Sequence, residues 1–419
     1  MKRRDFMQVL LAGLSLAPAC RVRDEILPPD SPQDTLPEPP LPPQADEASK
    51  IFWVKTVPDQ PFGNKLPNNH VGVDTLVDLM AAQELSFYKR KDSFKQSEAY
   101  GLIASDDVVL IKVNAQWKYR GCTNSDLVRG LIQRVLDHPD GFSGEVVIIE
   151  NGQGRGSLNC DTHLSYGGDR DIQANANDPS HSFLFLANEV FKGKPVSARL
   201  LDAIRRDFIS AQDHVSDGFR KLENVSYPCF TTARGNRVEL KEGIWKGGAY
   251  RQNLKLINVP VLKHHDVGGS EITAALKHFY GLVSMNDGHG RERHYLGLGE
   301  TCGKMIVSVR PPVLHIIDAI WVSHKALKGY PAKNTFRANQ ILASQDPVAL
   351  DYWAAKNVLY PYDNNKRHHP DFAGIAAWLE AARKMINDRG GIFAPEMGIR
   401  IDKVTKNESE MQLFTANSY

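Results

Sequence analysis

The strongest constraint on the fold of this 419-residue chain is a strand–helix–strand pattern between residues 107 and 150. Asp107–Val113 (DVVLIKV) and Glu145–Glu150 (EVVIIE) are short, β-branched apolar runs of the kind that forms buried strands. Between them, Asn124–Leu136 places its apolar residues on one helical face, and either Asn124 or Ser125 can cap it. Two strands joined by such a helix run parallel with a right-handed crossover, so this segment predicts a parallel sheet.

Strands and helices continue to alternate along the rest of the chain. Further strands are expected at residues 51–54, 256–259, 313–318 and 338–344. Further helices are expected at 73–85, 183–191, 198–211, 271–283, 301–309, 347–359 and 373–387, whereas 217–252 looks irregular or short-stranded. The alternation predicts the α/β class, with a mostly parallel sheet and flanking helices.

The start of the chain is typical of a bacterial export signal, so residues 1–20 are predicted to be a signal peptide. Arg3-Arg4 followed by Phe6 resembles a twin-arginine signal, which would make the twin-arginine export machinery a partner. A general secretory signal that carries two arginines is the alternative. Cys20 is either a lipidation site, which would tether the protein to a membrane, or an incidental cysteine.

Residues 21–49 are proline-rich and should form an extended, disordered linker, because such a segment cannot bury a core. Residues 50–419 are expected to form a single α/β domain. The formal net charge of +2 comes entirely from residues before Cys20, so the processed chain is neutral and gives no electrostatic case for nucleic acid. The expected location is periplasmic or, with a lipidated Cys20, membrane-tethered on the outer side of the inner membrane.

The cysteines do not identify a cofactor. No two of the five form a Cys-x-x-Cys pair, so there is no iron–sulfur cysteine motif. The four that follow Cys20 are either isolated buried thiols or disulfide partners, which an oxidising compartment would permit. The cofactor stays open at this point, with a metal ion as one candidate.

A first candidate ligand-binding cluster lies where the strand 107–113 ends. Lys112 and Asn114 stand at the carboxyl end of this strand, the place where open α/β sheets bind their ligands. A lysine there can neutralise an anion, and the capped helix start at Asn124 adds backbone N–H donors. The alternative for Lys112 is a strand-end lysine that reaches solvent.

A second cluster follows the strand 256–259 and is expected to complete the same site. Its predicted ligand-binding and catalytic residues are Lys263, His265, Gly268, Gly269, Thr273 and Lys277. The lysines and the glycine turn suit the binding of a small anion. Thr273 and Lys277 are four residues apart and would share one face of the helix expected over 271–283.

Three of the strand-end residues are candidate catalytic groups: His265, Lys277 and Asp318. His265 is the candidate acid or base, and Lys277 is a charge partner for the anion. Asp318 ends the strand 313–318, where a carboxylate can act as a base or hold a metal. His265 and His294 are the candidate metal ligands, although no standard ligand spacing is present.

Several segments resemble the domain-of-unknown-function family 362 (DUF362), a group of bacterial and archaeal proteins. The matching pieces are LIKVN, TNSDLVRGLI, LINVPVLKHH, EITAALKHFYGLV, IIDAI and ILASQDPVALD, in the family's order from about residue 107 to 351. The resemblance implies motif positions at Lys112, Asn114, Lys263, His265, Thr273, Lys277, Asp318, Ser344, Asp346 and Asp351. It implies no reaction. His278 departs from the family pattern, which usually has asparagine after the lysine.

The sequence therefore predicts an exported protein with a small-molecule pocket at the strand ends. The leading hypothesis is an enzyme that binds a small anionic substrate or cofactor, with metal- or redox-linked chemistry as one option. The competing hypothesis is a non-catalytic lipoprotein that binds a ligand or metal. A third option is an assembly factor for another exported enzyme.

Overall fold

The computed structural model describes residues 39–63, 67–152, 154, 157–161, 171–201, 208–266, 270–283 and 297–418. Residues 40–419 form one compact unit. The carbonyl groups of Pro40 and Leu41 accept hydrogen bonds from Tyr100 and Gln96, so this unit begins within the segment expected to be linker. The predicted signal peptide lies outside the described residues. None of the described helices has both the length and the apolar character needed to cross a membrane.

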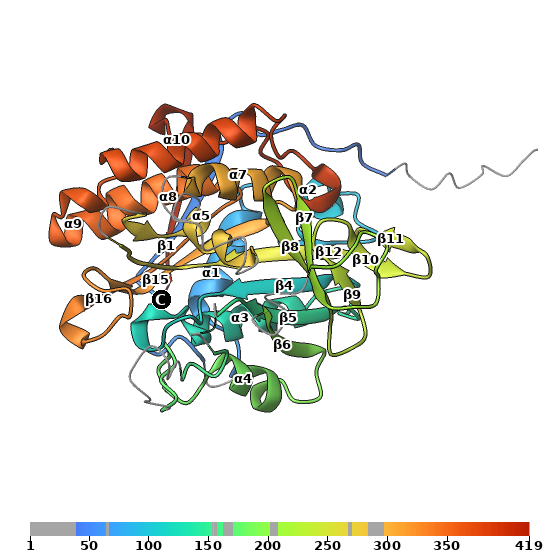
Figure 1. Ribbon diagram of the computed structural model, residues 1–419, viewed down its shortest axis with the longest axis horizontal. Coiled ribbons are helices and arrows are strands. Elements are labelled where there is room, and N and C mark those ends of the chain that lie inside the picture. The colour runs from blue at the N-terminus through green and yellow to red at the C-terminus, as the bar shows by residue number, and fades with distance from the viewer. Residues whose placement is uncertain are drawn as a thin grey trace, which may run out of the picture. The chain divides into compact units, whose positions relative to one another are not determined.

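A mostly parallel sheet forms the centre of the compact unit, as the sequence predicts (Figure 1). Within the described ranges it has ten strands, and its main path follows the order β17-β1-β16-β15-β12-β4-β5-β6. Neighbours from β15 to β6 are parallel, whereas β16 is antiparallel to both β1 and β15. The bounds are β1 Ser49–Lys55, β4 Val108–Val113, β5 Glu145–Glu150, β6 Val196–Leu200, β12 Leu254–Val259, β13 Val261–His264, β14 Ile272–Thr273, β15 Leu314–Ser323, β16 Thr335–Ser344 and β17 Met411–Asn417.

Helices cover both faces of the sheet. Figure 1 shows α7, α8 and α10 on one side of it and α3 on the other. The helix α1 packs with α3, whereas α5 packs with α7 and α8. The bounds are α1 Val71–Ala81, α2 Gln96–Ala99, α3 Ser125–Leu136, α4 Phe183–Phe185, α5 Ala275–Phe279, α7 Leu298–Ser308, α8 Pro347–Ala354, α9 Tyr360–Asp363 and α10 Ala373–Asn387.

The strands expected at 107–113 and 145–150 form as β4 and β5. Every residue of β4 and β5 is buried, which is normal for parallel strands that helices cover on both faces. The helix between them is capped as predicted, because the Asn124 side chain accepts a hydrogen bond from the Leu127 backbone N–H at 3.0 Å. This cap fixes the start of α3 beside the end of β4, at the edge of the sheet where the candidate site residues gather.

Two of the expected helices are wrong in part. In the helix expected over 198–211, the first residues belong instead to β6, which pairs with β5, and residues 202–207 lie outside the described residues. The helix expected from Glu271 begins only at Ala275, because the β-branched pair Ile272–Thr273 forms β14 against β13. In both places pairing with a neighbouring strand outweighs the local apolar spacing.

The segment expected to be irregular or short-stranded, 217–252, forms a separate antiparallel sheet of five short strands among the described residues. A two-stranded pair, β2 with β3, completes the described sheets. The bounds are β2 Tyr88–Lys89, β3 Ile103–Ala104, β7 Gly218–Leu222, β8 Val225–Thr231, β9 Arg237–Glu239, β10 Gly243–Lys246 and β11 Ala249–Arg251.

Candidate functional site

The candidate site lies where the strand order of the sheet reverses. The chain leaves β4 through α3 and enters β5 on one side, whereas β12 lies on the other side of β4. Connections that depart to opposite sides of two adjacent parallel strands leave a crevice outside their carboxyl ends. The carboxyl ends of β4 and β12 are Val113 and Val259, so the crevice is expected beside the segments that follow these two residues.

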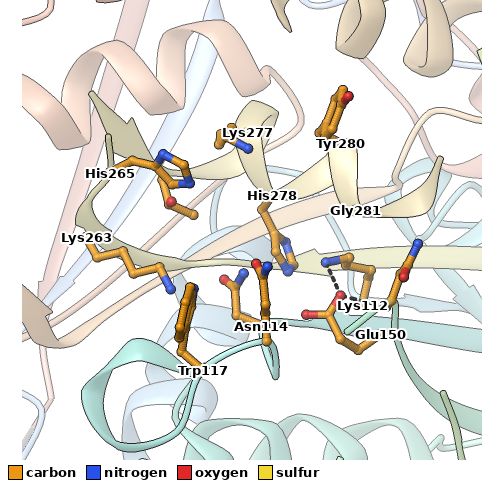
Figure 2. Close-up of a pocket in the computed structure, with 13 residues that line it drawn as sticks. Lys112, Asn114, Trp117, Glu150, Lys263, His265, Lys277, His278, Tyr280 and Gly281 are labelled. Carbon is orange, nitrogen blue, oxygen red and sulfur yellow. Dashed lines mark hydrogen bonds and ion pairs between the residues drawn. The ribbon is translucent and has the colours of Figure 1, made fainter. Parts of the chain in front are cut away.

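A pocket occupies this position, with a volume of about 410 Å³ that includes its opening to solvent. Its walls come from three parts of the chain that are distant in sequence, and Figure 2 shows their side chains converging on one space. The lining residues are Lys112, Asn114, Gln116, Trp117, Glu150, Asn151, Lys263, His265, Thr273, Lys277, His278, Tyr280 and Gly281.

A buried ion pair closes one end of the pocket. Lys112 Nζ donates to Glu150 Oε1 at 2.8 Å, and both side chains are almost fully buried. Backbone N–H groups of Ala115 and Asn151 also donate to the Glu150 carboxylate, each at 2.7 Å. Burial lowers the pKa of Lys112, and the adjacent carboxylate offsets part of that shift. With three donors on Glu150, the charge of Lys112 is compensated within the protein.

Two further buried lysines face the same space. Lys263 Nζ donates to the Gly121 carbonyl oxygen at 2.5 Å, a neutral acceptor. Burial lowers the pKa of Lys263 to about 7 and that of Lys277 to about 8. Desolvation disfavours an ammonium ion, so a negative charge brought into the pocket would restore the charged form of both lysines.

The imidazole of His265 has a fixed orientation of its ring nitrogens. Its Nδ1 lies 2.8 Å from the backbone nitrogen of Asp266 and 2.8 Å from Ser270 Oγ. A backbone N–H can only donate, so Nδ1 is an acceptor and the proton of the neutral ring sits on Nε2. His265 is therefore held as a donor through Nε2 in its neutral form.

Two buried polar atoms in the pocket lining have no hydrogen-bond partner among the described residues: Thr273 Oγ1 and His278 Nε2. Buried polar atoms are normally hydrogen-bonded, and an orphaned one calls for an explanation. Both side chains are nearly inaccessible to solvent, at 3% and 2% exposure. Their position in the lining is what a bound polar ligand would require.

The structure brings together most of the site residues that the sequence predicts. Six of them line the pocket side by side: Lys112, Asn114, Lys263, His265, Thr273 and Lys277. The expected reason for pairing Thr273 with Lys277 is wrong, since they come from β14 and α5 and not from one helix. Gly268, Gly269 and His294 lie outside the described residues.

Asp318 is the predicted catalytic residue that does not reach the pocket. It is fully buried in β15, where its two oxygens accept hydrogen bonds from the backbone N–H groups of Asn124 (2.7 Å) and Ile320 (3.0 Å). Burial raises its pKa to about 7. These contacts tie β15 to the start of α3, so Asp318 holds the scaffold of the site in place.

Sequence reasoning assigned no site role to the rest of the lining, namely Gln116, Trp117, Glu150, Asn151, His278, Tyr280 and Gly281. Glu150 carried a usable signal, because it ends the buried strand next to Lys112 and a lone carboxylate there needs a partner. His278 carried a weaker one, its departure from the DUF362 pattern. Nothing local distinguished Gly281.

Among the described residues no group of three or more histidine, cysteine, aspartate or glutamate side chains could hold a metal ion. The metal site suggested by His265 and His294 cannot be placed, since only His265 belongs to the described residues. Cys122, Cys160, Cys229 and Cys302 are buried free thiols.

Comparison with known proteins gives one match. Residues 231–356 match the family model described as Domain of unknown function (DUF362). No curated protein and no solved structure matches the chain. The matched range contains β12 to α5, and so the wall of the pocket that carries Lys263, His265, Lys277 and His278.

Proposed function

We propose that the protein, whose residues 231–356 match the DUF362 family model, is an exported enzyme that acts on a small anionic substrate in this pocket. The observation that carries the proposal is the charge balance of the lining. Three lysines line the pocket and, among the described residues, Glu150 is the single carboxylate that does so. That carboxylate is already engaged by Lys112.

Burial makes this excess of cationic groups costly in the absence of a ligand. Lys263 and Lys277 are desolvated enough that their pKa values fall to about 7 and 8. An anion bound between them would gain charge-assisted hydrogen bonds and would relieve that cost. The pocket thus favours a carboxylate or phosphate over a neutral ligand.

The same groups are suited to proton transfer. A lysine with a pKa near 7 can accept or donate a proton at neutral pH, as acid–base catalysis requires. His265, whose neutral ring carries its proton on Nε2, is a candidate hydrogen-bond donor to the substrate in the same space. These features favour an enzyme over the alternative, a non-catalytic lipoprotein that binds a ligand or metal.

Export is part of the proposal and rests on the sequence. Arg3-Arg4, the apolar run and Cys20 support a twin-arginine signal and, if Cys20 is lipidated, a membrane tether. Fusing residues 1–49 to a reporter tests this. A reporter that stays inside the cell, or one exported equally well with Arg3→Lys and Arg4→Lys, would contradict twin-arginine export.

The binding test compares Lys263→Met and Lys277→Met with the unaltered protein by titration calorimetry, using phosphate, oxalate, succinate and malate as probes. Loss of one charge-assisted hydrogen bond is worth about 1.5–3 kcal/mol, so each variant should bind at least tenfold more weakly. Lys255→Met is the matched control, because Lys255 is also buried, with a pKa lowered to about 8, but lies outside the lining. Equal affinity in all three variants, or no binding by any probe, would overturn the proposal.

Enzyme and binding protein are separated by the fate of the bound compound. Protein purified after export is incubated with each probe that binds, and the compound is then recovered and analysed by mass spectrometry and NMR. Chemical change that disappears with Lys263→Met supports an enzyme. Unaltered recovery of every ligand, including any that copurifies, supports the non-catalytic alternative.

A further inference from the structure

His278 lines the pocket, and its two ring nitrogens differ in their contacts with the described residues. Figure 2 shows its ring projecting from α5 toward the strand ends. Its Nδ1 lies 2.8 Å from Asn258 Oδ1. Its Nε2 is buried and has no hydrogen-bond partner within the part of the chain that the structure describes.

Asn258 determines which nitrogen of that ring carries the proton. The Asn258 amide nitrogen donates to the Ala275 carbonyl oxygen at 2.9 Å, and it lies 3.0 Å from His315 Nδ1. A flipped amide would set its oxygen against the Ala275 carbonyl oxygen, so the observed orientation is the stable one. Asn258 Oδ1 must therefore accept, and His278 Nδ1 must donate.

The ring of His278 is held neutral by its surroundings. It is buried, and desolvation, followed by the charge of nearby Lys112, lowers its pKa well below the ordinary value, against a smaller opposing effect of the Val113 backbone. A neutral imidazole protonated at Nδ1 has a lone pair at Nε2. So low a basicity suits a hydrogen-bond acceptor better than a group that removes protons.

The pocket thus contains two histidines in opposite tautomers. His265 accepts through Nδ1 and carries its proton on Nε2, whereas His278 donates through Nδ1 and presents a lone pair. The lysines supply cationic groups for an anion, but a lysine ammonium has no lone pair to offer. His278 Nε2 is a buried acceptor for a donor on the ligand.

We propose that His278 determines specificity by accepting a hydrogen bond from a hydroxyl group of the substrate, so the substrate class is small hydroxy carboxylates. The carboxylate contacts Lys263 and Lys277, and the hydroxyl satisfies His278 Nε2. This inference rests on the proposed anion site and names its substrate class. A site built around a buried acceptor rejects the analogue that lacks the donor, because the acceptor would then stay unpaired.

The test compares pairs of acids that differ by one hydroxyl: glycolate with acetate, and each enantiomer of malate with succinate. Calorimetry on the full chain should give about tenfold or greater preference for a hydroxylated member. In His278→Asn, which keeps a small amide beside Asn258, that preference should fall to near unity. Thr273→Val is the competing variant, since Thr273 Oγ1 is the other unpartnered atom.

Each outcome decides the question. Equal binding of both members of every pair overturns the inference and leaves the anion site intact, as does a preference lost in Thr273→Val but kept in His278→Asn. Binding of none of these acids, nor of phosphate or oxalate, overturns the anion site itself.

The tautomer of His278 can be tested independently by ¹⁵N NMR of labelled histidines, with the His278 signal assigned by its loss in His278→Asn. The spectrum should show a neutral ring protonated at Nδ1. A ring protonated at Nε2 would overturn the inference.

Discussion

The ammonium group of Lys112 and the carboxylate of Glu150 meet at 2.8 Å between two adjacent parallel strands, β4 and β5, and neither side chain reaches solvent. Removing one partner would leave the other as an unpaired charge in the protein interior. Breaking a buried pair in this way typically costs about 3–5 kcal/mol, far more than a surface ion pair contributes.

Glu150→Gln should therefore lower the free energy of unfolding by about 3–5 kcal/mol, measured by urea denaturation at neutral pH. The double variant Lys112→Met with Glu150→Gln removes both charges and should recover part of the loss. A single variant as stable as the unaltered protein would show that Lys112 is already neutral in the folded state.

Gly281 should not tolerate a methyl group. A Cβ there would lie 2.8 Å from Lys112 Nζ and 3.2 Å from its Cε, and the lysine cannot move without leaving Glu150. Gly281→Ala should lower the free energy of unfolding by about 1–3 kcal/mol, as overpacking does, and should also weaken anion binding. Gly63→Ala is the control, since a Cβ at that residue meets nothing within 4 Å. Identical melting and affinity for both alanine variants would contradict the prediction.

Anion affinity should fall as the pH rises from 6 to 9. The protonated lysines bind the anion, and Lys263 and Lys277 lose their protons around pH 7 and 8 in the free protein. Calorimetric titration with oxalate, a dianion throughout this range, reads the effect without titration of the ligand. Lys263→Met and Lys277→Met should each flatten part of the profile, and Lys255→Met should leave it unchanged.

The stability of the free protein should change with pH in the opposite direction. Lysine has a pKa of 10.5 before burial, so between about 7 and 10.5 the unfolded state holds a proton that folded Lys263 has released. The state that binds more protons is favoured by acid, hence the folded state gains stability as the pH rises through this window. The gain is at most about 1.4 kcal/mol per pH unit for each such lysine. Urea denaturation at several pH values should show a smaller slope for Lys263→Met than for the unaltered protein.

Asp318→Asn should destabilise the fold without changing the ligand site. Both oxygens of Asp318 accept backbone N–H groups, and the amide nitrogen of asparagine would face one of these donors. A loss of about 1–3 kcal/mol in the free energy of unfolding is expected, with affinity for oxalate unchanged. A folded variant that binds normally but no longer converts its substrate would instead support the catalytic role that the sequence suggested.

The sequence predicts the sheet well because β4 and β5 are buried on both faces, which leaves an unmistakable apolar run. It fails at Ile272–Thr273 and Val196–Leu200, where the conformation depends on a neighbouring strand that is distant in the chain. The spacing of apolar residues within one segment does not indicate which distant strand will pair with it.

The dependence on distant parts of the chain also explains which site residues could be predicted from the sequence. Lys112 and Lys263 could be predicted from their positions at strand ends, because the carboxyl ends of parallel strands meet at one edge. Asp318 shares that sequence context, yet its oxygens are taken up by backbone donors from Asn124 and Ile320. The role of His278 depends on the orientation of Asn258, which only a three-dimensional arrangement can define.

The position of β12 in the sheet bears on how the DUF362 match can be used. The matched range, residues 231–356, contains β12 and β15 but not β4, the strand that pairs with β12 along its whole length. A fragment cut to those limits would have a bare, apolar sheet edge in place of β4 and would lack Lys112 and Glu150. Such a fragment should aggregate and should bind no anion, so the smallest unit worth expressing must extend upstream past β4.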